Sequence, residues 1–393
     1  MNLRQKIEQE IRERGPIPFS RYMELCLYDP ELGYYSRNAE KFGKAGDFYT
    51  SSDVHAVFGR LLARQFEEIW RALGEPGQME ILELGPGRGL FAQDVLDWSE
   101  RKFPDFFQAL HYTLAESSTA LRDQLTSRFR RPIEAGKVSL PNPTGEDSSA
   151  SSGQPARQST DMTRRTLAPE APLIIFANEF FDALPVEVLS EKGSLRINVR
   201  EQNFVEQWAP ASAEELEFLD RYSLHPEGEA RTEVALLSQQ QISHYTEMMQ
   251  TGFFVLVDYG YTREEQLAGR HLGTVMAYRQ HSASPNPYEA PGEQDITAHV
   301  NFTALAAVAE KNGMHAHKLL TQSQFLLGIG EANQFADAFE DCRLPQERAK
   351  VALQLKHLVT PAGVGETFHV LVASKGVDAE RVVRLGGLSF ARS

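Results

Sequence analysis

One short stretch, Met79 to Phe91, constrains the fold of this chain more than any other segment. It begins with the mostly apolar run Met79–Leu84, in which Glu83 is the last acid, and a helical pattern then continues to Trp98. Such a run is typical of a strand that is buried on both faces of a parallel sheet. Glycines between strand and helix permit positive φ and a close ligand approach, because they carry no Cβ. The stretch therefore predicts a strand, a tight turn and a helix, which in open α/β sheets bind ligands beyond the carboxyl end of the strand.

The spacing of the glycines narrows the kind of ligand. Gly85, Gly87 and Gly89 follow the pattern G-x-G-x-G, whereas the dinucleotide fingerprint is G-x-G-x-x-G and the phosphate loop ends in Gly-Lys-Ser/Thr. Glu83 would face a bound anion unfavourably and suits a ligand with an ammonium or sulfonium group. E-x-G-x-G-x-G is similar to the first motif of S-adenosylmethionine-dependent methyltransferases. The alternative is a glycine-rich turn without a ligand, and the flanking strand and helix argue against it.

Composition and charge limit the class of protein. The chain has 393 residues, 41% hydrophobic and 24% charged, and a net charge of −14. The composition is ordinary for a soluble globular protein, and the charge argues against nucleic-acid binding. The two cysteines, Cys26 and Cys342, lack metal-ligand spacing, and no apolar run is long enough to span a membrane. The N-terminus resembles neither a signal peptide nor an acid-poor transit peptide, so we expect a cytoplasmic, bacterial setting.

Further strands are expected to bring polar side chains to the same edge of the sheet. The patterns predict strands at His111–Glu116, Leu173–Ala177 and Phe253–Tyr261. In a doubly wound sheet, an acid that ends the second strand accepts hydrogen bonds from ribose hydroxyls, which makes Glu116 the candidate. A helix-capping or surface role is the alternative for Glu116.

The segment after the central strand is the richest in chemistry. It runs Asn178, Glu179, Phe180, Phe181, Asp182, Ala183, Leu184 and Pro185. An amide, two carboxylates and two aromatic rings are therefore expected beside the cofactor cleft, although ordinary helix-start chemistry would explain Asn and Asp as well. Asp258 and Tyr259 are expected at the same edge of the sheet, and a turn-capping role for Asp258 is the alternative.

The rest of the chain predicts two additions to the sheet. Helices are predicted at Leu3–Arg14, at Arg21–Tyr28 with Ser20 as its cap, and at Val54–Leu73. Residues 141–171 are rich in Ser, Thr, Gly and Pro and lack aromatics, which predicts a flexible insertion. Residues 186–235 predict an accessory hairpin and helix. We therefore divide the chain into an N-terminal helical lid, 1–75, and a Rossmann-like domain, 76–393, and expect the lid and the accessory insertion to form the acceptor walls.

Six segments, in this order, resemble the MidA family of methyltransferases. They are residues 46–51 (GDFYTS), 83–89 (ELGPGRG), 178–185 (NEFFDALP), 258–260 (DYG), 295–300 (DITAHV) and 365–368 (GETF). The likeness covers nearly the whole chain apart from the insertion, and residues 178–185 are its most specific part. The chain departs from the family pattern at Ser52 and Asp53, where the family has Pro-Glu.

The resemblance implies a class I methyltransferase fold, with a mostly parallel seven-stranded sheet and helices on both faces, and S-adenosylmethionine as cofactor. The implied cofactor contacts are Glu83, Gly85, Pro86, Gly87, Gly89, Glu116 and Asn178, with Asp47, Tyr49 and Thr50 on the lid. It also implies a protein substrate, because mitochondrial members of the family assist assembly of respiratory complex I by symmetric dimethylation of an arginine.

Arginine methylation sets requirements on the acceptor side. A guanidinium is a poor nucleophile because it stays protonated, and carboxylates can clamp its donors, aim one nitrogen and help to remove a proton. Glu179, Asp182 and Asn178 are the catalytic candidates, and Phe180, Phe181, Asp258 and Tyr259 the candidates for substrate binding. Two alternatives stay open: a methyltransferase for an O, N or C atom of a small molecule, and an assembly factor that binds the cofactor without turnover. The oligomeric state, a homodimer included, is also open.

Overall fold

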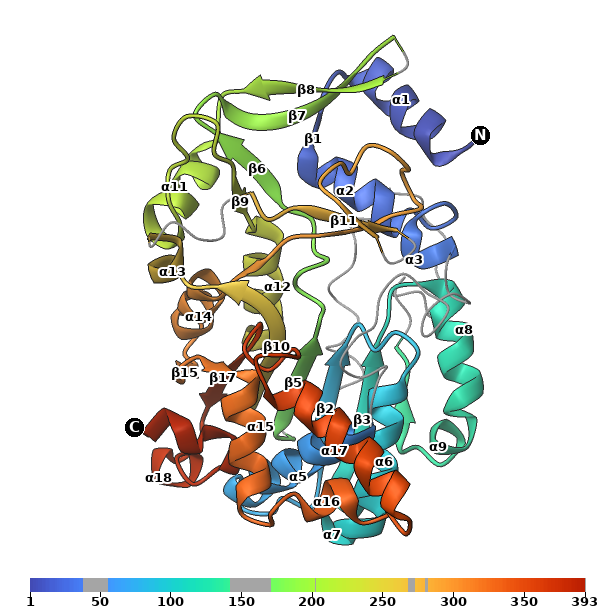
Figure 1. Ribbon diagram of the computed structural model, residues 1–393, viewed down its shortest axis with the longest axis vertical. Coiled ribbons are helices and arrows are strands. Elements are labelled where there is room, and N and C mark those ends of the chain that lie inside the picture. Colours follow the sequence, from blue (N-terminus) through green and yellow to red (C-terminus); the bar gives the residue numbers. More distant parts are fainter. Residues whose placement is uncertain (38–55, 142–170, 202, 268–272, 280–281, 393) are drawn as a thin grey trace.

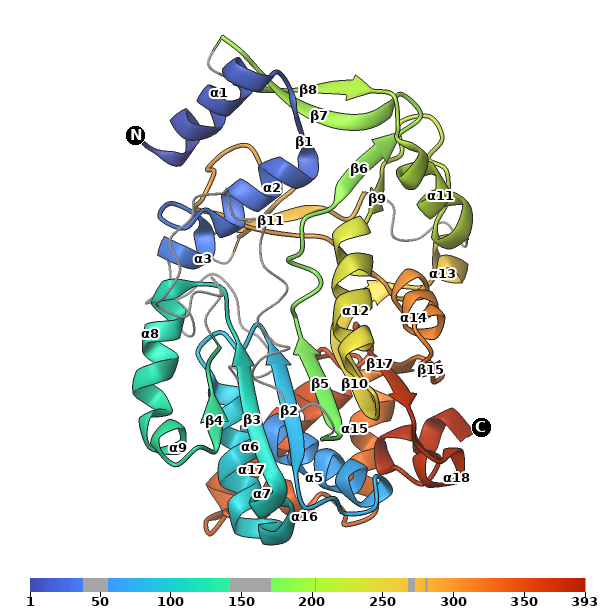
Figure 2. The same cartoon turned by 180° about the vertical axis from the view of Figure 1, so that it is seen from behind.

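The computed structural model describes most of the chain. The described residues are 1–37, 56–141, 171–201, 203–267, 273–279 and 282–392. The predicted lid contacts Asp47, Tyr49 and Thr50, and nearly all of the predicted insertion 141–171, lie outside the described residues. A large sheet with its helices occupies the lower half of Figure 1, and an accessory lobe lies above the carboxyl ends of its central strands (Figures 1 and 2).

The central sheet confirms the predicted α/β class. Its order is β15-β17-β10-β5-β2-β3-β4, with the short strands β14 and β16 paired to β10 and β17. The bounds are β2 Met79–Leu84, β3 Leu110–Ala115, β4 Val138–Ser139, β5 Leu173–Asn178, β10 Gly252–Tyr261, β14 Val300–Asn301, β15 His315–Ala316, β16 Leu320–Thr321 and β17 Phe368–Lys375. Strands β4, β3, β2, β5 and β10 run parallel, and β17 is antiparallel to β10. Along the main path the sheet has the mostly parallel arrangement that we predicted.

Helices cover both faces of this sheet, as predicted. One face packs against α5 (Ala56–Ala72) and α6 (Leu90–Lys102), and the other against α12 (Leu236–Met248) and α14 (Phe302–Lys311). On the first face the ring of Phe91 stacks on that of Phe176 with centroids 4.4 Å apart, and Phe66 meets Phe176 edge-on at 5.6 Å. Burying one such phenylalanine stabilises the fold by about 1.5–3 kcal/mol. This packing fixes the strand ends that carry the site.

The remaining helices extend the two faces and the sheet edge. They are α7 Pro104–Ala109, α8 Thr119–Arg128, α9 Arg130–Glu134, α13 Arg263–Leu267, α15 Gln322–Glu331, α16 Ala336–Phe339, α17 Pro345–Val359, α18 Ala379–Val382 and the 3₁₀ helix Gly386–Arg392. Thr321 caps α15 in a capping box with Gln324. No helix within the described ranges combines the length and the apolar character that crossing a membrane requires.

The accessory lobe joins segments that are far apart in the sequence. Its strands are β1 Ile17–Pro18, β6 Glu187–Ser190, β7 Gly193–Arg200, β8 Asn203–Ala209, β9 Thr232–Val234, β11 Met276–Arg279, β12 Ser282–Ser284 and β13 Asp295–Thr297. Its helices are α1 Leu3–Arg14, α2 Phe19–Tyr28, α3 Tyr34–Arg37 and α11 Ala213–Tyr222. The predicted hairpin is the β6–β7 pair, and β1 pairs with β7.

Two details of the N-terminal prediction are refined by the structure. Ser20 does not cap α2: the cap position is Pro18, and the Ser20 hydroxyl donates a hydrogen bond to Glu187 at 2.5 Å. Helix α5 packs in the core of the central sheet, whereas α1, α2 and α3 belong to the accessory lobe. A domain boundary near residue 75 stays a prediction.

Candidate functional site

The glycine loop follows β2 and opens α6, as the sequence predicts. All three of its glycines have positive φ, with 63° at Gly85, 54° at Gly87 and 72° at Gly89. A Cβ at Gly87 would meet no described residue within 4 Å, so the backbone there faces space that the described part of the chain leaves open. A Cβ at Gly85 would lie 2.8 Å from a ring carbon of Phe180. The loop thus leaves room for a ligand at Gly87 and touches the segment after β5 at Gly85.

Glu116 follows β3 directly and turns back toward the glycine loop. Its carboxylate accepts hydrogen bonds from the amides of Gly87 at 3.3 Å and Ser118 at 2.8 Å. Burial raises the pKa of Glu116 to about 7, against the effect of these amide donors. Glu116 therefore lies next to the glycine loop, which is the position that we predicted for a carboxylate that binds the ribose hydroxyls.

Glu83 lies inside β2 and is 4% exposed. It accepts a hydrogen bond from the Tyr112 hydroxyl at 2.8 Å, and burial raises its pKa to about 8. Pro86, within the loop, is buried as well, and its carbonyl accepts a hydrogen bond from the Gly89 amide at 2.8 Å. A nearby cation would favour the ionised form of Glu83.

The segment after β5 forms a strained acidic turn. Glu179 has φ of 50°, which is uncommon for a residue with a Cβ and concentrates at functional sites. Its amide donates to the carbonyl of Val257 at 3.0 Å, which continues the β5–β10 pairing. The side-chain amide of Asn178 donates to Glu179 at 3.3 Å, and the buried Asn178 Oδ1 has no hydrogen-bond partner among the described residues.

Asp258 lies beneath this turn and fixes its backbone. It is fully buried and accepts hydrogen bonds from the amides of Phe181 at 3.0 Å, Asp182 at 3.3 Å and Tyr259 at 2.9 Å. Burial, followed by the charges of Asp182 and Glu179, raises the pKa of Asp258 well above its usual value. Phe181 is 2% exposed and packs edge-on against Phe254. Supporting roles therefore fit Asp258 and Phe181 better than the direct substrate contacts that we predicted.

Asp182 is the second carboxylate of the turn and is 4% exposed. Tyr259 donates its hydroxyl to Asp182 Oδ2 at 2.6 Å, and Ala298 donates its amide to the Asp182 carbonyl at 2.9 Å. Among the described residues, the buried Oδ1 has no hydrogen-bond partner and Asp182 forms no ion pair. Burial raises its pKa to about 6, against the effect of the Tyr259 hydroxyl and the nearby amides of Ala183 and Asp182. A desolvated carboxylate with one unused oxygen is an acceptor for a cationic donor.

Residues that sequence reasoning missed complete the surroundings of Asp182. Tyr28 donates its hydroxyl to the Ala183 carbonyl at 3.0 Å, and Tyr35 donates to Asp295 Oδ1 at 3.0 Å. Tyr278 lies close enough to Asp182 and Asp295 for both charges to raise its pKa, although burial is the larger cause. The only sequence signals were the tyrosines around the turn after α2 and the acid that opens segment 295–300.

Together, the sheet order, the glycine loop and the acid after β3 define a class I S-adenosylmethionine-dependent methyltransferase. A profile of an S-adenosyl-L-methionine-dependent methyltransferase family matches residues 61–320. The chain belongs to this family, the MidA family of methyltransferases that the sequence resembles. Its cofactor is S-adenosylmethionine.

Similar proteins extend over nearly the whole chain. The mitochondrial protein arginine methyltransferase NDUFAF7 homolog of Drosophila melanogaster is 28% identical, over 99% of this chain and 89% of its own. The corresponding enzyme of Danio rerio is 27% identical, over 92% of this chain and 84% of its own. The crystal structure of a Burkholderia thailandensis protein bound to S-adenosyl-homocysteine matches with a TM-score of 0.77 at 27% identity, covering 98% and 94% of the two chains.

Proposed function

We propose that this methyltransferase modifies an arginine side chain of a protein substrate, by symmetric dimethylation, and that the first candidate substrate is a subunit of respiratory complex I. The observation that carries the proposal is Asp182, three residues after the strained Glu179, because its buried Oδ1 has no hydrogen-bond partner within the described part of the chain. The names of the Drosophila and Danio relatives support the same acceptor. The complex I subunit follows from the family resemblance.

The cofactor half of the proposed site is the glycine loop with Glu116. The open space at Gly87 admits the cofactor, while Gly85, Pro86 and Gly89 shape the loop around it. Glu116 accepts hydrogen bonds from the ribose hydroxyls, and Asn178 Oδ1 at the end of β5, which has no partner among the described residues, is a further acceptor. Glu83, in β2 just before the loop, attracts the cationic part of the cofactor when its carboxylate is ionised. Asp47, Tyr49 and Thr50 remain predicted contacts.

The acceptor half is the acidic turn. S-adenosylmethionine supplies a methyl group on a sulfonium, so the protein must align one guanidinium nitrogen and help to remove a proton. Glu179 and Asp182 hold the guanidinium by paired hydrogen bonds, with Asn178 orienting Glu179. Phe180 of this turn extends toward Gly85, and its ring forms a wall for the planar cation. Tyr259 acts through the hydrogen bond that it donates to Asp182.

The test uses extracts of cells that lack the gene as the pool of unmethylated substrates. Purified wild-type protein, Glu179→Gln, Asp182→Asn and Glu201→Gln are each incubated with the extract and labelled S-adenosylmethionine. Glu201 is the matched control, because it is an exposed acid with the same φ of 50° in the β7–β8 turn. Mass spectrometry then counts dimethylated arginines, with complex I subunits searched first.

We expect Glu179→Gln and Asp182→Asn to lower the transfer rate by roughly a hundredfold, the usual scale for a lost catalytic acid or base. Affinity for S-adenosyl-homocysteine should stay within about twofold, and Glu201→Gln should behave as wild type. Wild-type rates in both site variants would remove these roles from the turn. Labelled metabolites without labelled arginine would favour a small-molecule enzyme, and binding without any transfer would favour an assembly factor.

A further inference from the structure

We propose that the N-terminal segment supplies one wall of the acceptor site, and that Tyr28 and Tyr35 are positioning residues that hold the acidic turn ready for a planar cation. This inference rests on the proposed function and assigns to it residues outside the central sheet. Tyr28 ends α2 and Tyr35 lies in α3, so both come from the first 37 residues. Their hydroxyls reach the turn after β5 and the strand β13.

Tyr28 completes the set of contacts that fix the backbone on each side of Asp182. Asp258 binds the amide of Asp182, the amide of Ala298 binds its carbonyl, and Tyr28 binds the next carbonyl, that of Ala183, at 3.0 Å. Tyr28 is partly buried, and the burial of its phenol raises the pKa well above the usual value. The neutral phenol is therefore a permanent donor to the turn, and losing it frees the peptide that follows Ala183.

Tyr35 links the acceptor side to the cofactor side. Its hydroxyl donates to Asp295 at 3.0 Å, and its carbonyl accepts a hydrogen bond from the Ser118 hydroxyl at 3.0 Å. The amide of Ser118 in turn donates to Glu116, the proposed ribose acid, at 2.8 Å. The rings of Tyr28 and Tyr35 lie 5.4 Å apart, centroid to centroid. The two halves of the proposed site thus meet at this pair of rings.

The charges around these rings select a cation. Burial is the first cause of the raised pKa values of Tyr28 and Tyr35, and the carboxylates of Asp295 and Asp182 are further causes for both. Two acids therefore act on the same phenols, and Tyr278 feels both charges as well. Tyrosine faces attract guanidinium groups, whereas an anion or a neutral urea would gain nothing from the acids.

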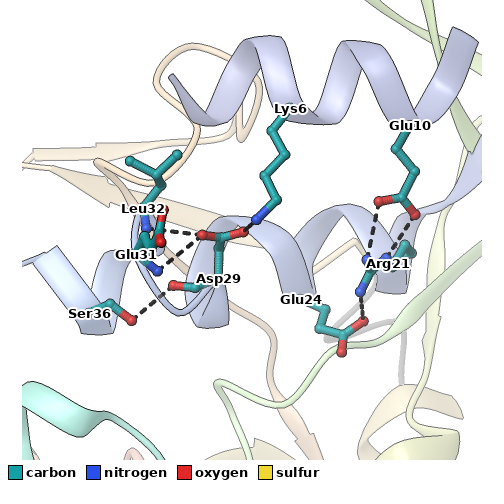
Figure 3. Close-up of polar contacts among 8 residues, drawn as sticks. All are labelled: Lys6, Glu10, Arg21, Glu24, Asp29, Glu31, Leu32 and Ser36. Atoms are coloured by element: carbon teal, nitrogen blue, oxygen red, sulfur yellow. Dashed lines mark hydrogen bonds and ion pairs between the residues drawn. The ribbon is translucent and has the colours of Figure 1, made fainter. Parts of the chain in front are cut away.

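A rigid joint sets the positions of both tyrosines. Asp29, which separates Tyr28 from α3, is 3% exposed and binds the Lys6 ammonium (Figure 3). Its side chain also accepts the amides of Glu31 at 3.2 Å and Leu32 at 3.0 Å, and its carbonyl accepts the Ser36 hydroxyl at 2.9 Å. Burial alone would raise the pKa of Asp29, but Lys6 and the two amides hold it below its usual value.

The packing of α1 on α2 reinforces this joint. Arg21 of α2 donates to both oxygens of Glu10 of α1, at 3.0 and 3.1 Å, and to Glu24 at 2.8 Å (Figure 3). After Asp29, a Cβ at Gly33 would lie 2.5 Å from the Asp29 amide nitrogen, so only glycine fits there. The wall is therefore preorganised, which lowers the entropy lost when a substrate side chain is held in one geometry.

The test compares two tyrosines of the same helix. Tyr22 is buried and Tyr28 partly buried in α2, and each hydroxyl donates to a backbone carbonyl at 3.0 Å, but Tyr22 binds Pro287 and Tyr28 binds the acidic turn. Tyr28→Phe, Tyr22→Phe and Tyr35→Phe are made in the full-length chain. With S-adenosyl-homocysteine at saturation, N-acetylarginine amide, N-acetyllysine amide and N-acetylcitrulline amide are titrated by calorimetry, and the affinity for S-adenosyl-homocysteine and the melting temperature are measured separately.

We expect wild-type protein to bind the arginine amide and to reject the neutral citrulline amide. Tyr28→Phe and Tyr35→Phe should weaken arginine-amide binding about fivefold, the effect of one lost hydrogen bond, while Tyr22→Phe stays within about twofold. Affinity for S-adenosyl-homocysteine should stay within about twofold in all three. Equal effects of Tyr28→Phe and Tyr22→Phe on arginine-amide binding would overturn the inference. If wild type binds the lysine amide instead, and Tyr28→Phe and Tyr35→Phe but not Tyr22→Phe weaken that binding, the arginine proposal fails while the tyrosine wall stands. No binding of any amide overturns both.

Discussion

The glycine loop and the acidic turn are neighbours at one edge of the sheet, yet they are held in different ways. The loop after β2 is fixed by positive φ at three glycines, by a hydrogen bond from Gly89 to Pro86 at 2.8 Å, and by the end of the adjacent strand β3, where Ala115 and Glu116 accept the amides of Gly85 and Gly87. The turn after β5 is fixed by other segments, namely Asp258 and Tyr259 of β10, Ala298 beyond β13 and Tyr28 of α2.

This difference separates the donor side of the reaction from the acceptor side. A loop that depends on local backbone conformation can stay unchanged while the segments around it vary. A turn that depends on distant partners changes whenever one of those partners changes. The proposed acceptor selectivity is therefore distributed over the accessory lobe, and the cofactor site is confined to two strand ends.

The strongest test of this contrast is a Cβ at Gly87. Gly87→Ala should weaken the binding of S-adenosyl-homocysteine roughly a hundredfold, about 3 kcal/mol, because the methyl group fills the open space at the loop and strains a φ of 54°. Calorimetry measures the affinity, and circular dichroism shows that the fold persists. Gly136→Ala is the matched control, since Gly136 has φ of 68° and equally open space but lies after α9. Equal affinity losses in the two variants would move the cofactor away from Gly87.

A second test removes a support from beneath the acidic turn. Asp258→Asn keeps one oxygen of the acid that binds three amides, so the turn loosens and methyl transfer should fall about thirtyfold. Affinity for S-adenosyl-homocysteine should change by less than about twofold, because the glycine loop does not depend on Asp258. Transfer is measured with the cell-extract assay.

The control for Asp258 is another buried acid that binds backbone amides. Glu233 is 3% exposed and accepts the amides of Thr274 at 2.7 Å and Val275 at 3.3 Å, within the accessory lobe. Both Asp258→Asn and Glu233→Gln should lower the free energy of unfolding by about 1–3 kcal/mol. If Glu233→Gln lowered transfer as much as Asp258→Asn, the effect would be general destabilisation and the turn would lose its special role.

The same contrast explains what could be predicted from the sequence. The strand β2, its glycines and the acid after β3 depend on patterns within a few residues, and the structure has them where we predicted them. Tyr28 and Asp295 could not be found in this way, because their contacts join residues that are 155 and 260 positions apart in the chain. Asp258 was placed correctly at the end of its strand, but no local pattern shows which way a side chain points or that it binds amides beneath the turn.

The smallest expected effect concerns pH. Burial raises the pKa of Asp182 to about 6, so a fall from pH 7 to pH 5 should weaken N-acetylarginine amide binding about tenfold, as the carboxylate becomes protonated. S-adenosyl-homocysteine must be present at a saturating concentration at both pH values. This is needed because Glu116, on the cofactor side, has a pKa of about 7 and changes its own charge in this range. The pH dependence should disappear in Asp182→Asn. If it persists, a different group near the turn is responsible.

Several groups face Asp182 and are the candidates for such a persistent effect. They are Glu179 in the turn, Asp258 and Tyr259 on β10, Asp295 on β13, Tyr278 on β11, Tyr28 and Tyr35 from the N-terminal segment, and His299, whose ring packs edge-on against Tyr259 at 5.3 Å. The phenols stay neutral between pH 5 and 7, because burial raises their pKa values. The variant His299→Gln tests whether this imidazole contributes to the pH dependence.

Stability must change in the opposite sense to acceptor binding. The pKa of Asp182 is about 6 in the folded protein and 3.8 ordinarily, so its contribution favours the folded state at low pH and is lost as the pH rises through 6. A bound guanidinium restores that loss, because it pairs with the ionised form. N-acetylarginine amide should therefore raise the melting temperature more at pH 7.5 than at pH 5, and this difference should vanish in Asp182→Asn. A larger rise in melting temperature at pH 5 would mean that the cation binds elsewhere. The acidic turn would then have a structural role only and would not form the acceptor half of the site opposite the glycine loop.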